Sequence, residues 1–364
     1  MKLFINDNIR SYSRQRGVAR CFWQITDGLI RNFQAETTIF SPAGRNYGPA
    51  KHFRGVQLDF RGSHRLRLHR VTDKWAEWVA NRMGASVFFS PYYGNAHPKA
   101  PEIFMVHDMI HALPEYRADE TPMAASFRLE VRRCLERAAC LIAVSRNTAE
   151  DIVKCYPHIS PDKIVVIHHG VDAFFFDAAK ELPAASHKPF FLFVGNRQGY
   201  KNFLRLLQAF GESGLSQAYD LRVISPGPKS FTGTEDRLIR KFAMEKSVHF
   251  SGNEDVNLRA SYAAAVAFVY PSEYEGFGMP VLEAMAAGSV VAASNRSSIP
   301  EVGGEALLYF DPLEVASLSA CLRRAADLSS EAREQLRGRG LARAREFTWE
   351  QAVQKTVRVM NRFR

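Results

Sequence analysis

Short apolar runs that alternate with amphipathic stretches are the feature that most constrains this fold. In the first half, the predicted strands are Lys2–Asn6, Thr37–Phe40, Val56–Phe60, Ser86–Ser90, Ile103–Val106, Cys140–Val144 and Lys163–His168. Helical patterns fall between several of them, at Val18–Phe33, Lys74–Met83, Ala124–Ala139 and Asn147–Tyr156. Because parallel strands need crossover connections, this alternation predicts a doubly wound parallel α/β sheet.

The alternation stops and then resumes, which predicts two domains. Asp177 to Lys188 has no periodicity and mixes Ala, Pro and Ser with charges, as a linker does. Strands are predicted after it at Phe190–Val194, Leu221–Ile224, Val248–Phe250, Ala265–Tyr270, Ser289–Ala293 and Ala306–Phe310. Helices are predicted at Asn202–Ser213, Glu235–Glu245, Asn257–Ala264, Pro280–Ala287, Ala316–Leu328, Ser330–Phe347 and Trp349–Arg362. The expected division is residues 1–176, a linker at 177–188, a second domain at 189–347 and a last helix at 348–364.

Composition limits the class of protein. The chain has 364 residues, enough for two domains, and its 46% apolar share fits a soluble globular protein. No apolar run is long enough to span a bilayer, and the start does not read as a signal peptide. The five cysteines are scattered without metal-ligand spacing, which predicts a reduced, cytoplasmic protein. The net charge of +10 favours anionic partners without choosing among them.

One stretch, Pro271 to Gly288, combines glycines and acids between a predicted strand and a predicted helix. Proline is favoured in the first turn of a helix, so Pro280 predicts its start, and Gly288 can close it. Glu275 then falls in the loop and Glu283 in the first turn. Both lie near the N-terminal end of the helix, which attracts anions. These acids can simply complement the helix dipole, or they can hold sugar hydroxyls while backbone amides hold a phosphate.

The whole string favours the second interpretation. Ser272, Glu275-Gly-Phe-Gly278, Pro280, Glu283 and Gly288 resemble the donor-site signature of the retaining glycosyltransferases of family 4, also called group 1. That resemblance implies the GT-B architecture, in which two Rossmann-like domains face each other across a cleft and the last helix crosses back to the N-terminal domain. It further implies that no divalent metal is needed.

The resemblance also assigns roles within the stretch. Glu275 would hold the donor sugar and Glu283 the ribose hydroxyls. Backbone close to the donor phosphates would come from Gly276, Phe277, Gly278, Met279, Pro280 and Val281. A further glycine, Gly17, looks like the family's first phosphate-approaching loop, although it can equally be a helix N-cap.

Two cations follow the first strand of the second domain. Arg197 and Lys201 lie at its expected carboxyl end, where ligands of such sheets bind. Exposed cations in a loop are often only solvated. The segment nevertheless resembles the family's second donor motif, whose Arg and Lys bind the nucleotide diphosphate and stabilise its charge as it leaves. The intervening Asn196 and the short spacing of the two cations depart from the commoner pattern.

A strand end in the first domain carries His107-Asp108. Such a pair is often structural, but it resembles the family's "HD" strand end, whose histidine lies beside the donor sugar. Asp108 would orient that ring or its strand. His168 and His169 point opposite ways on a strand, so they do not predict a metal site.

A cluster of arginines comes just before a predicted helix of the first domain, and the helix itself carries two tryptophans. The residues are Arg61, Arg65, Arg67, Arg70, Trp75 and Trp78. A solvated face is the ordinary interpretation. Family members that use lipid-linked acceptors often sit on the cytoplasmic membrane, and a face of this kind suits peripheral contact. A second arginine-rich stretch, Arg333 to Arg345, could contact phosphates or merely flank the last helix. No recognised nucleic-acid module is present, so nucleic acid is not an expected partner.

The resemblance predicts a retaining hexosyltransferase that uses a nucleotide-diphosphate sugar and a saccharide or lipid-linked acceptor. It leans toward O-antigen and exopolysaccharide enzymes that use GDP-mannose. A UDP-sugar donor, a GT-B epimerase or phosphorylase, and a silent partner subunit remain alternatives. A nicotinamide dehydrogenase is disfavoured because no early strand is followed by the glycine fingerprint.

Overall fold

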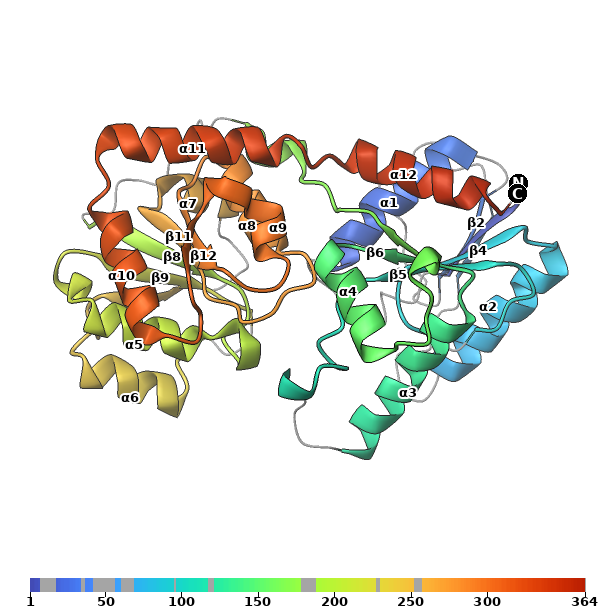
Figure 1. Cartoon of the computed structure of the whole chain (residues 1–364), viewed down its shortest axis with the longest axis horizontal. Helices are drawn as coiled ribbons and strands as arrows, with labels where there is room; N and C mark the ends of the chain where they lie inside the picture. The colour runs from blue at the N-terminus through green and yellow to red at the C-terminus, as the bar shows by residue number, and fades with distance from the viewer. Residues whose placement is uncertain are drawn as a thin grey trace. The chain divides into compact units, whose positions relative to one another are not determined.

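The computed structural model describes residues 1–6, 18–33, 37–41, 56–59, 69–94, 96–116, 121–177, 188–226, 230–251 and 257–363. The chain forms two compact units (Figure 1). One comprises Met1–Gly170 and Thr348–Arg364, and the other Val171–Phe347. Each unit is built on one parallel sheet, so the predicted α/β class is confirmed.

The first unit contains a seven-stranded sheet in the order β3-β2-β1-β4-β5-β6-β7. The described pairs are all parallel. The strands are β1 Leu3–Asn6, β2 Thr37–Ser41, β3 Val56–Asp59, β4 Val87–Ser90, β5 Glu102–Val106, β6 Cys140–Ala143 and β7 Ile164–Val166. Chain order reverses between β1 and β4, which is the switch point of a doubly wound sheet. Each strand lies where the apolar runs predict it.

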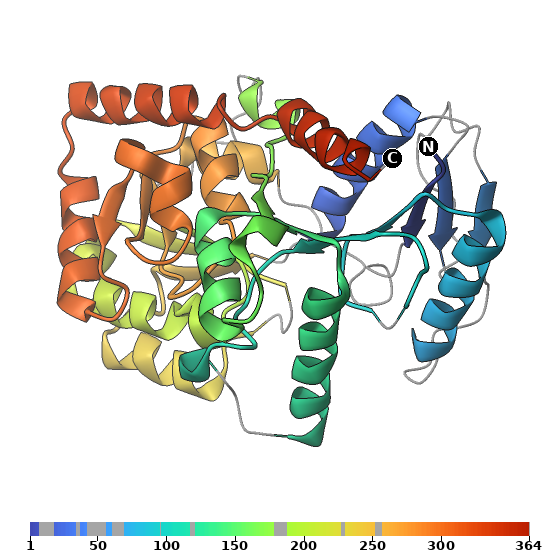
Figure 2. The same ribbon diagram turned by 45° about the vertical axis from the view of Figure 1, so that its right-hand side comes forward.

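Helices cover both faces of this sheet. They are α1 Val18–Phe33, α2 His69–Met83, α3 Pro122–Arg137, α4 Arg146–Cys155 and α12 Trp349–Asn361, with 3-10 turns at Pro114–Tyr116 and Pro161–Lys163. Helices α2, α3 and α4 share apolar clusters with the strands. Helices α1 and α12 lie side by side in both ribbon views (Figures 1 and 2). The chain's last helix therefore completes its first unit.

Glycines make the close packing of α12 possible. A Cβ placed on Gly28 of α1 would lie 2.3 Å from a Val353 methyl of α12. A Cβ on Gly170 would lie 2.1 Å from the Trp349 backbone nitrogen. Both distances are impossible for real atoms, so any side chain at these positions would push α12 away.

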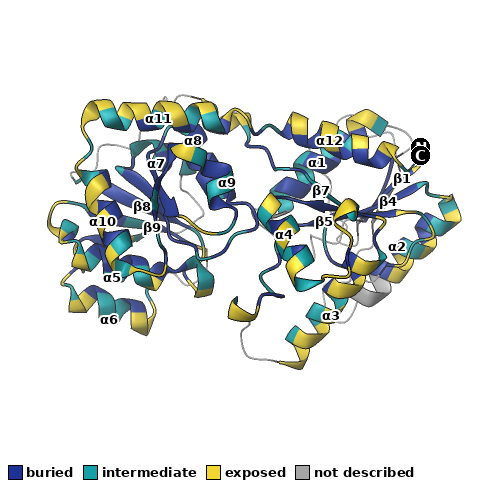
Figure 3. Ribbon diagram, viewed as in Figure 1, coloured by how far each residue is buried: buried dark blue, intermediate teal, exposed yellow. Residues whose placement is uncertain are grey.

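The second unit contains a six-stranded sheet in the order β10-β9-β8-β11-β12-β13, with its described pairs parallel. The strands are β8 Phe190–Val194, β9 Asp220–Ile224, β10 Val248–Ser251, β11 Ala267–Tyr270, β12 Val291–Ser294 and β13 Leu308–Phe310. In the edge strand β10, His249 is exposed, whereas every residue of β8, β11 and β12 is buried, and β8 and β9 are dark in Figure 3. Burial on both faces explains why these runs are almost continuously apolar.

The helices of the second unit are α5 Phe203–Glu212, α6 Gly233–Lys241, α7 Leu258–Ala264, α8 Met279–Ala286, α9 Ile299–Gly303, α10 Val315–Ala326 and α11 Ser330–Ala344. Helices α5, α6 and α10 form one apolar layer with the sheet. Helices α7, α8, α9 and α11 pack together on the other side. Helix α9 was not predicted, because five residues containing Pro300 carry no measurable helical period.

The boundary between the units differs from the expected one. The segment 171–177 packs with the second unit, whereas the first domain was predicted to reach residue 176. The Val171 N–H donates to the Phe347 carbonyl at 3.1 Å, and Phe175 contacts Tyr262 with 6.4 Å between ring centroids. Arg259 donates to the Asp177 carbonyl at 2.9 Å. Backbone pairing and aromatic burial thus move the boundary to Gly170; the predicted linker, from residue 178 to 187, lies outside the described residues.

Candidate donor site at the carboxyl edge of the second sheet

Strands β8 and β11 are neighbours in the sheet although they are far apart in the chain. Chain order reverses between them, so the loops that follow them diverge at the carboxyl edge. Such switch points are where ligands bind in open α/β sheets. The predicted cations follow β8 and the predicted acids follow β11, so the topology brings the two loops to one place.

The loop after β8 is held by its own helix cap. Asn202 adopts the left-handed conformation, with φ 61°, at the start of α5. Its side-chain amide donates to the Pro271 carbonyl at 3.1 Å and to the Pro312 carbonyl at 2.7 Å. Arg205 adds an ion pair with Glu273 at 2.9 Å. These contacts join the loops that follow β8, β11 and β13, so the edge is fixed before any ligand binds.

Lys201 and Glu275 meet at this edge. The Lys201 Nζ lies 2.5 Å from Glu275 Oε1 and donates to the Tyr270 hydroxyl at 3.3 Å. The Lys201 and Glu275 side chains are 18% and 12% exposed, so the pair is shielded yet reachable from solvent. Both residues were predicted to belong to one site, and they form an ion pair although 74 positions of chain separate them.

Serines of the loop before α9 hold Glu275 in place. The Ser297 hydroxyl accepts from the Glu275 N–H at 2.9 Å, and the Ser298 hydroxyl donates to the Glu275 carbonyl at 2.8 Å. Ser297 itself has φ 52°, a strained value for a residue other than glycine. Beneath the pair, burial and the nearby Glu275 charge raise the pKa of Tyr270 well above its ordinary value. Tyr270 is therefore a neutral hydroxyl at the site.

Helix α8 starts beside this pair. Gly278 caps it with φ 93°, which favours glycine, and Gly288 follows its end with φ 73°. The helix begins at Met279, one residue before the predicted Pro280, so Glu283 lies in the second turn and not in the first. Glu283 is only 4% exposed. Phe277 packs edge-on against Phe347, with 5.9 Å between ring centroids.

Arg197 lies in a different environment from Lys201. Its Nη1 lies 3.0 Å from Glu235 Oε2, and its Nη2 donates to the Ser230 carbonyl at 2.8 Å. The guanidinium also lies 5.4 Å from the Phe231 ring centroid and 5.1 Å from that of Phe250. With 6% of the residue exposed, Arg197 is a buried, paired side chain that faces the start of α6.

In the first unit, His107 follows β5 and is buried. Its Nε2 lies 2.9 Å from the Pro91 carbonyl oxygen. Because a carbonyl only accepts, Nε2 carries the proton and Nδ1 is left as the acceptor. Burial lowers the pKa of His107 to about 4, although the Pro91 contact opposes this shift. The imidazole is therefore neutral near pH 7.

The neighbours of His107 were not expected. The His169 ring stacks on it with 5.6 Å between centroids, and the Trp349 ring centroid lies 5.6 Å from that of His169. Burial also lowers the pKa of His169 well below its ordinary value. The Asp108 carboxylate accepts the Ile110 N–H at 3.2 Å and lies 4.0 Å from His111, so it shapes the turn that follows the strand.

Gly17, the remaining predicted site residue, lies outside the described residues, as do Arg61, Arg65 and Arg67. On α2, the Trp75 and Trp78 side chains are 46% and 58% exposed. None of the described helices combines the length and apolar character that crossing a membrane requires.

Comparison with known proteins assigns the family. The model of the family "Glycosyl transferases group 1" matches residues 154–342, more than half of the chain. The chain belongs to this family. A second model, "Glycosyltransferase Family 4", matches residues 15–173, almost all of which lie in the first unit. The protein is thus a glycosyltransferase, as the donor-site string predicts.

Curated relatives of this glycosyltransferase include two mannosyltransferases of Escherichia coli. The O-antigen chain mannosyltransferase B of Escherichia coli is 29% identical over 293 residues, which are 77% of this chain and 75% of the relative. The serotype-specific mannosyltransferase WbdA of the same species is 28% identical over 68% of this chain, but the match spans only 32% of WbdA.

Solved structures establish the fold of the glycosyltransferase as GT-B. The sucrose-phosphate synthase of Thermosynechococcus elongatus superposes with a TM-score of 0.76 at 19% identity, over 99% of this chain and 98% of that one. The Anabaena protein HepE, solved with UDP-glucose, gives 0.76 at 13% identity, over 99% of each chain. The lipopolysaccharide enzyme WaaG gives 0.73 at 17% identity, over 98% and 99% of the two chains.

Some parts of the glycosyltransferase site were missed by sequence reasoning. Glu235, Ser297 and His169 each contact a predicted site residue from a distant segment. Only Glu235 has a visible signal: it follows Thr232 by three residues, which is the spacing of a capping box, and that box is present. The signal predicts a helix start and says nothing of Arg197.

Proposed function

We propose that this glycosyltransferase transfers a hexose, with retention of anomeric configuration, from a nucleotide-diphosphate sugar to a saccharide or lipid-linked acceptor. The Lys201–Glu275 ion pair at the β8/β11 switch point carries this proposal. It supplies one cation and one anion, 2.5 Å apart, beside the start of α8. A donor with an anionic diphosphate and a hydroxyl-rich sugar needs that combination.

Lys201 is the proposed diphosphate ligand. Its ammonium would exchange part of its contact with Glu275 for a phosphate oxygen and stabilise the charge that develops on the leaving group. The Gly278 and Met279 amides would bind the phosphates at the helix start. Pro280 has no N–H, and the Val281 N–H donates to the Gly278 carbonyl at 3.0 Å, so these two residues shape the turn.

Glu275 and Glu283 are the proposed hydroxyl ligands. Glu275, released from Lys201, would accept from hydroxyls of the donor sugar, and Glu283 would accept from the ribose. Gly276 would let the chain approach the donor closely. His107 would accept a sugar hydroxyl at Nδ1, since its Nε2 is engaged with Pro91. In this proposal Arg197 remains paired with Glu235 and positions the loop that follows β8.

For the donor we propose GDP-mannose and a role in bacterial surface polysaccharide synthesis. The support is the group of relatives named O-antigen chain or serotype-specific mannosyltransferases. A UDP-sugar is the second candidate, because HepE shares the fold and was solved with UDP-glucose. We further propose that transfer needs no metal ion, because Lys201 can offset the diphosphate charge. Transfer that vanishes with EDTA and returns with Mg²⁺ would contradict this.

The test is transfer of radiolabelled mannose from GDP-mannose to a lipid-linked saccharide fraction, beside the same assay with UDP-glucose. Lys201→Ala and Glu275→Ala should each lower kcat/KM by about 100-fold or more, the scale for losing one charged contact to a transition state. Glu245→Ala and Lys246→Ala are matched controls, because these exposed residues precede β10 at the opposite edge of the sheet. Wild-type transfer rates in the site variants would refute the proposal.

We also propose peripheral contact of the first unit with the cytoplasmic face of the membrane. Trp75 and Trp78 support it, since they lie three residues apart on α2 with exposed rings. Trp75→Ser/Trp78→Ser should reduce co-sedimentation with phosphatidylglycerol vesicles several-fold. Leu129→Ser on α3, whose side chain is also 46% exposed, is the control. Equal losses in both variants would argue against a specific membrane face.

A further inference from the structure

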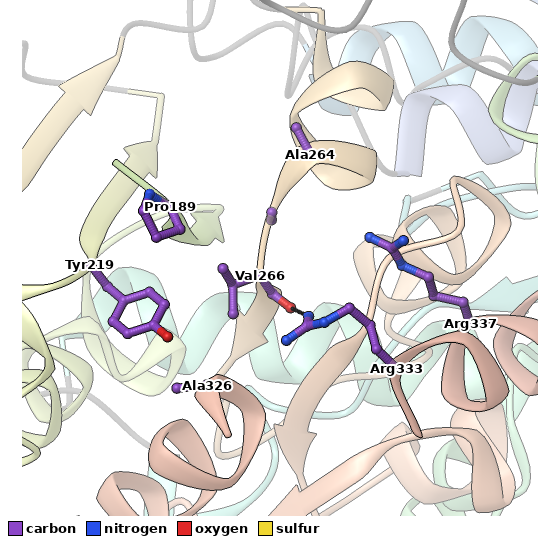
Figure 4. Close-up of a pocket in the computed structure, with 8 residues that line it drawn as sticks. Pro189, Tyr219, Ala264, Val266, Ala326, Arg333 and Arg337 are labelled. Carbon is purple, nitrogen blue, oxygen red and sulfur yellow. Dashed lines mark hydrogen bonds between the residues drawn. The ribbon is translucent and has the colours of Figure 1, made fainter. Parts of the chain in front are cut away.

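A cavity lies at the amino edge of the second sheet, away from the strand ends that carry the proposed donor site (Figure 4). It has a volume of about 290 Å³. Pro189 comes just before β8 and Val266 just before β11, so the cavity opens at the starts of these strands. Its other walls come from Tyr219, from Ala326 at the end of α10 and from α11.

Two arginines of α11 line this cavity. Arg333 and Arg337 are four residues apart, so their side chains lie on one face of the helix. In Figure 4 the Arg333 guanidinium reaches the Val266 carbonyl, and Arg337 lies beside it on the same helix. The Tyr219 side chain lies on the other side of Val266 from the arginines. The cavity therefore has a cationic wall opposite an aromatic one.

The positive charge of this wall is not balanced within the described part of the chain. There, no carboxylate lines the cavity, and neither arginine forms an ion pair, although Asp327 and Glu334 lie nearby in sequence. Like charges held this close repel each other, and burial adds to the cost. Accordingly, burial and the neighbouring Arg337 lower the pKa of Arg333. An anion would offset both effects.

Hydrogen-bond donors remain available to such an anion. Arg333 donates to the Val266 carbonyl at 2.5 Å and to the Ala325 carbonyl at 3.0 Å, which fixes its guanidinium. Arg337 donates to the Ala263 carbonyl at 3.5 Å, and its buried Nε has no partner among the described residues. A guanidinium offers five N–H donors, so most of those on Arg337 are unused by these contacts.

We propose that this cavity binds the phosphate group of a small phosphorylated molecule, at a site separate from the donor site. Paired guanidinium groups suit phosphate because they bind its oxygens through charge-assisted, often bidentate hydrogen bonds. The volume lies just under the range of drug-sized pockets, so the organic body must be small. The apolar surfaces of Pro189, Val266 and Ala326 would contact that body.

Calorimetric titration at low ionic strength tests this site, with inorganic phosphate and glycerol 3-phosphate as separate probes. Arg337→Gln should weaken binding at least tenfold, while Lys201→Ala should retain it. The exposed Arg339→Gln, on the same helix, is the matched control and should bind within twofold of wild type. Tighter binding of glycerol 3-phosphate than of phosphate would identify an organic phosphate as the ligand; the reverse order would identify the free anion.

A second variant leaves both arginines in place. Ala326→Glu introduces a carboxylate into the wall of the cavity and should also weaken binding at least tenfold. This variant tests the anion site if Arg337→Gln does not fold. The proposal is overturned if wild type binds neither probe at millimolar concentration or if Ala326→Glu binds like wild type. It is also overturned if Lys201→Ala abolishes binding while Arg337→Gln keeps it, or if Arg339→Gln weakens binding as much as Arg337→Gln.

Discussion

Arg197 and Lys201 are four residues apart and carry the same charge, yet their surroundings are opposite. Lys201 is partly exposed and pairs with Glu275, whereas Arg197 is buried between aromatic rings and pairs with Glu235. A buried ion pair is costly to break because the remaining partner cannot be solvated. Lys201, being partly exposed, is therefore the cation that can exchange partners.

Breaking the buried pair should cost stability rather than donor affinity. Arg197→Met should lower the free energy of unfolding by about 3–5 kcal/mol, because Glu235 is left buried and charged. Arg197→Met/Glu235→Gln should recover part of that loss. Urea unfolding measures both. Titration with GDP then separates the two roles: a double variant that is stable but binds GDP tenfold more weakly would make Arg197 a diphosphate ligand.

The burial of His107 predicts a pH dependence. Its pKa falls to about 4 in the folded protein, so between pH 7 and pH 5 only the unfolded chain takes up this proton. The free energy of unfolding should therefore decrease as the pH is lowered. Between pH 7 and pH 5, it should decrease by about 2 kcal/mol more in wild type than in His107→Asn. Met105→Leu, in the preceding strand, should give the same difference from wild type at both pH values. Parallel pH curves for wild type and His107→Asn would contradict the assignment.

Residue roles could be predicted only in part. The proximity of Lys201 and Glu275 could be predicted from the sheet topology and the donor-site string. The Arg197–Glu235 pair could not be predicted, because nothing in the sequence says which of several nearby polar groups a buried arginine will reach. For the same reason the His107–His169 stack was missed, since it joins two strand ends whose spacing depends on the register of the sheet.

At the scale of elements, α8 is the helix on which the site depends. Its described side chains from Met279 to Ala286 are buried with the exception of Pro280, which is partly exposed. A helix that is apolar on nearly every side must be covered on nearly every side. Helix α11 covers it closely: a Cβ on Gly340 would lie 3.5 Å from the Met285 side chain. The C-terminal half of α8 is thereby packed against α11.

The two glycines that flank α8 give a matched pair of variants. Gly278→Ala should cost about 1–2 kcal/mol through its positive φ alone, because the nearest atoms to the new Cβ lie 3.9 Å away. Gly288→Ala, with φ 73° and open space around it, should cost a similar amount. Only Gly278→Ala should weaken nucleotide binding in a thermal-shift assay. Equal effects of both variants on binding would mean that the start of α8 does not contact the donor.

Elements with a clear apolar pattern were predicted well, and helix starts without such a pattern were predicted poorly. Helix α1 was predicted with its bounds, Val18–Phe33, and so was strand β8, Phe190–Val194. Helix α2 begins five residues before the predicted Lys74, because His69 to Asp73 has too few apolar residues to show a period. Helix α9 escaped prediction for the reason given above, although its preceding serines hold Glu275.

At the scale of the whole molecule, the chain leaves its first unit at Gly170 and returns to it at Thr348. The returning segment forms α12, whose own side chains at Trp349, Ala352, Val353, Val359 and Met360 are buried. Each large apolar side chain buried in this way contributes about 1.5–3 kcal/mol. The first unit therefore depends on a helix that is remote in sequence, whereas the second unit is continuous.

A chain that ends at Phe347 should lose stability in the first unit alone. The expected loss is on the order of 5 kcal/mol, given the side chains that α12 removes from water. Hydrogen exchange should then accelerate in strands β4 to β6 and stay unchanged in β8 to β12. A chain that ends at Asn361 keeps α12 and serves as the control. Equal protection of both sheets in the shorter chain would show that α12 contributes little.

This return of the chain has a consequence for synthesis on the ribosome. The unit that emerges first cannot close at once, because the surface beside Gly28 and Gly170 is covered by α12, which is translated after the whole second unit. The half that emerges second has its strands in one continuous stretch and can finish sooner. The first unit therefore completes its fold only after the second unit has been synthesised, which reverses the order in which the two emerge.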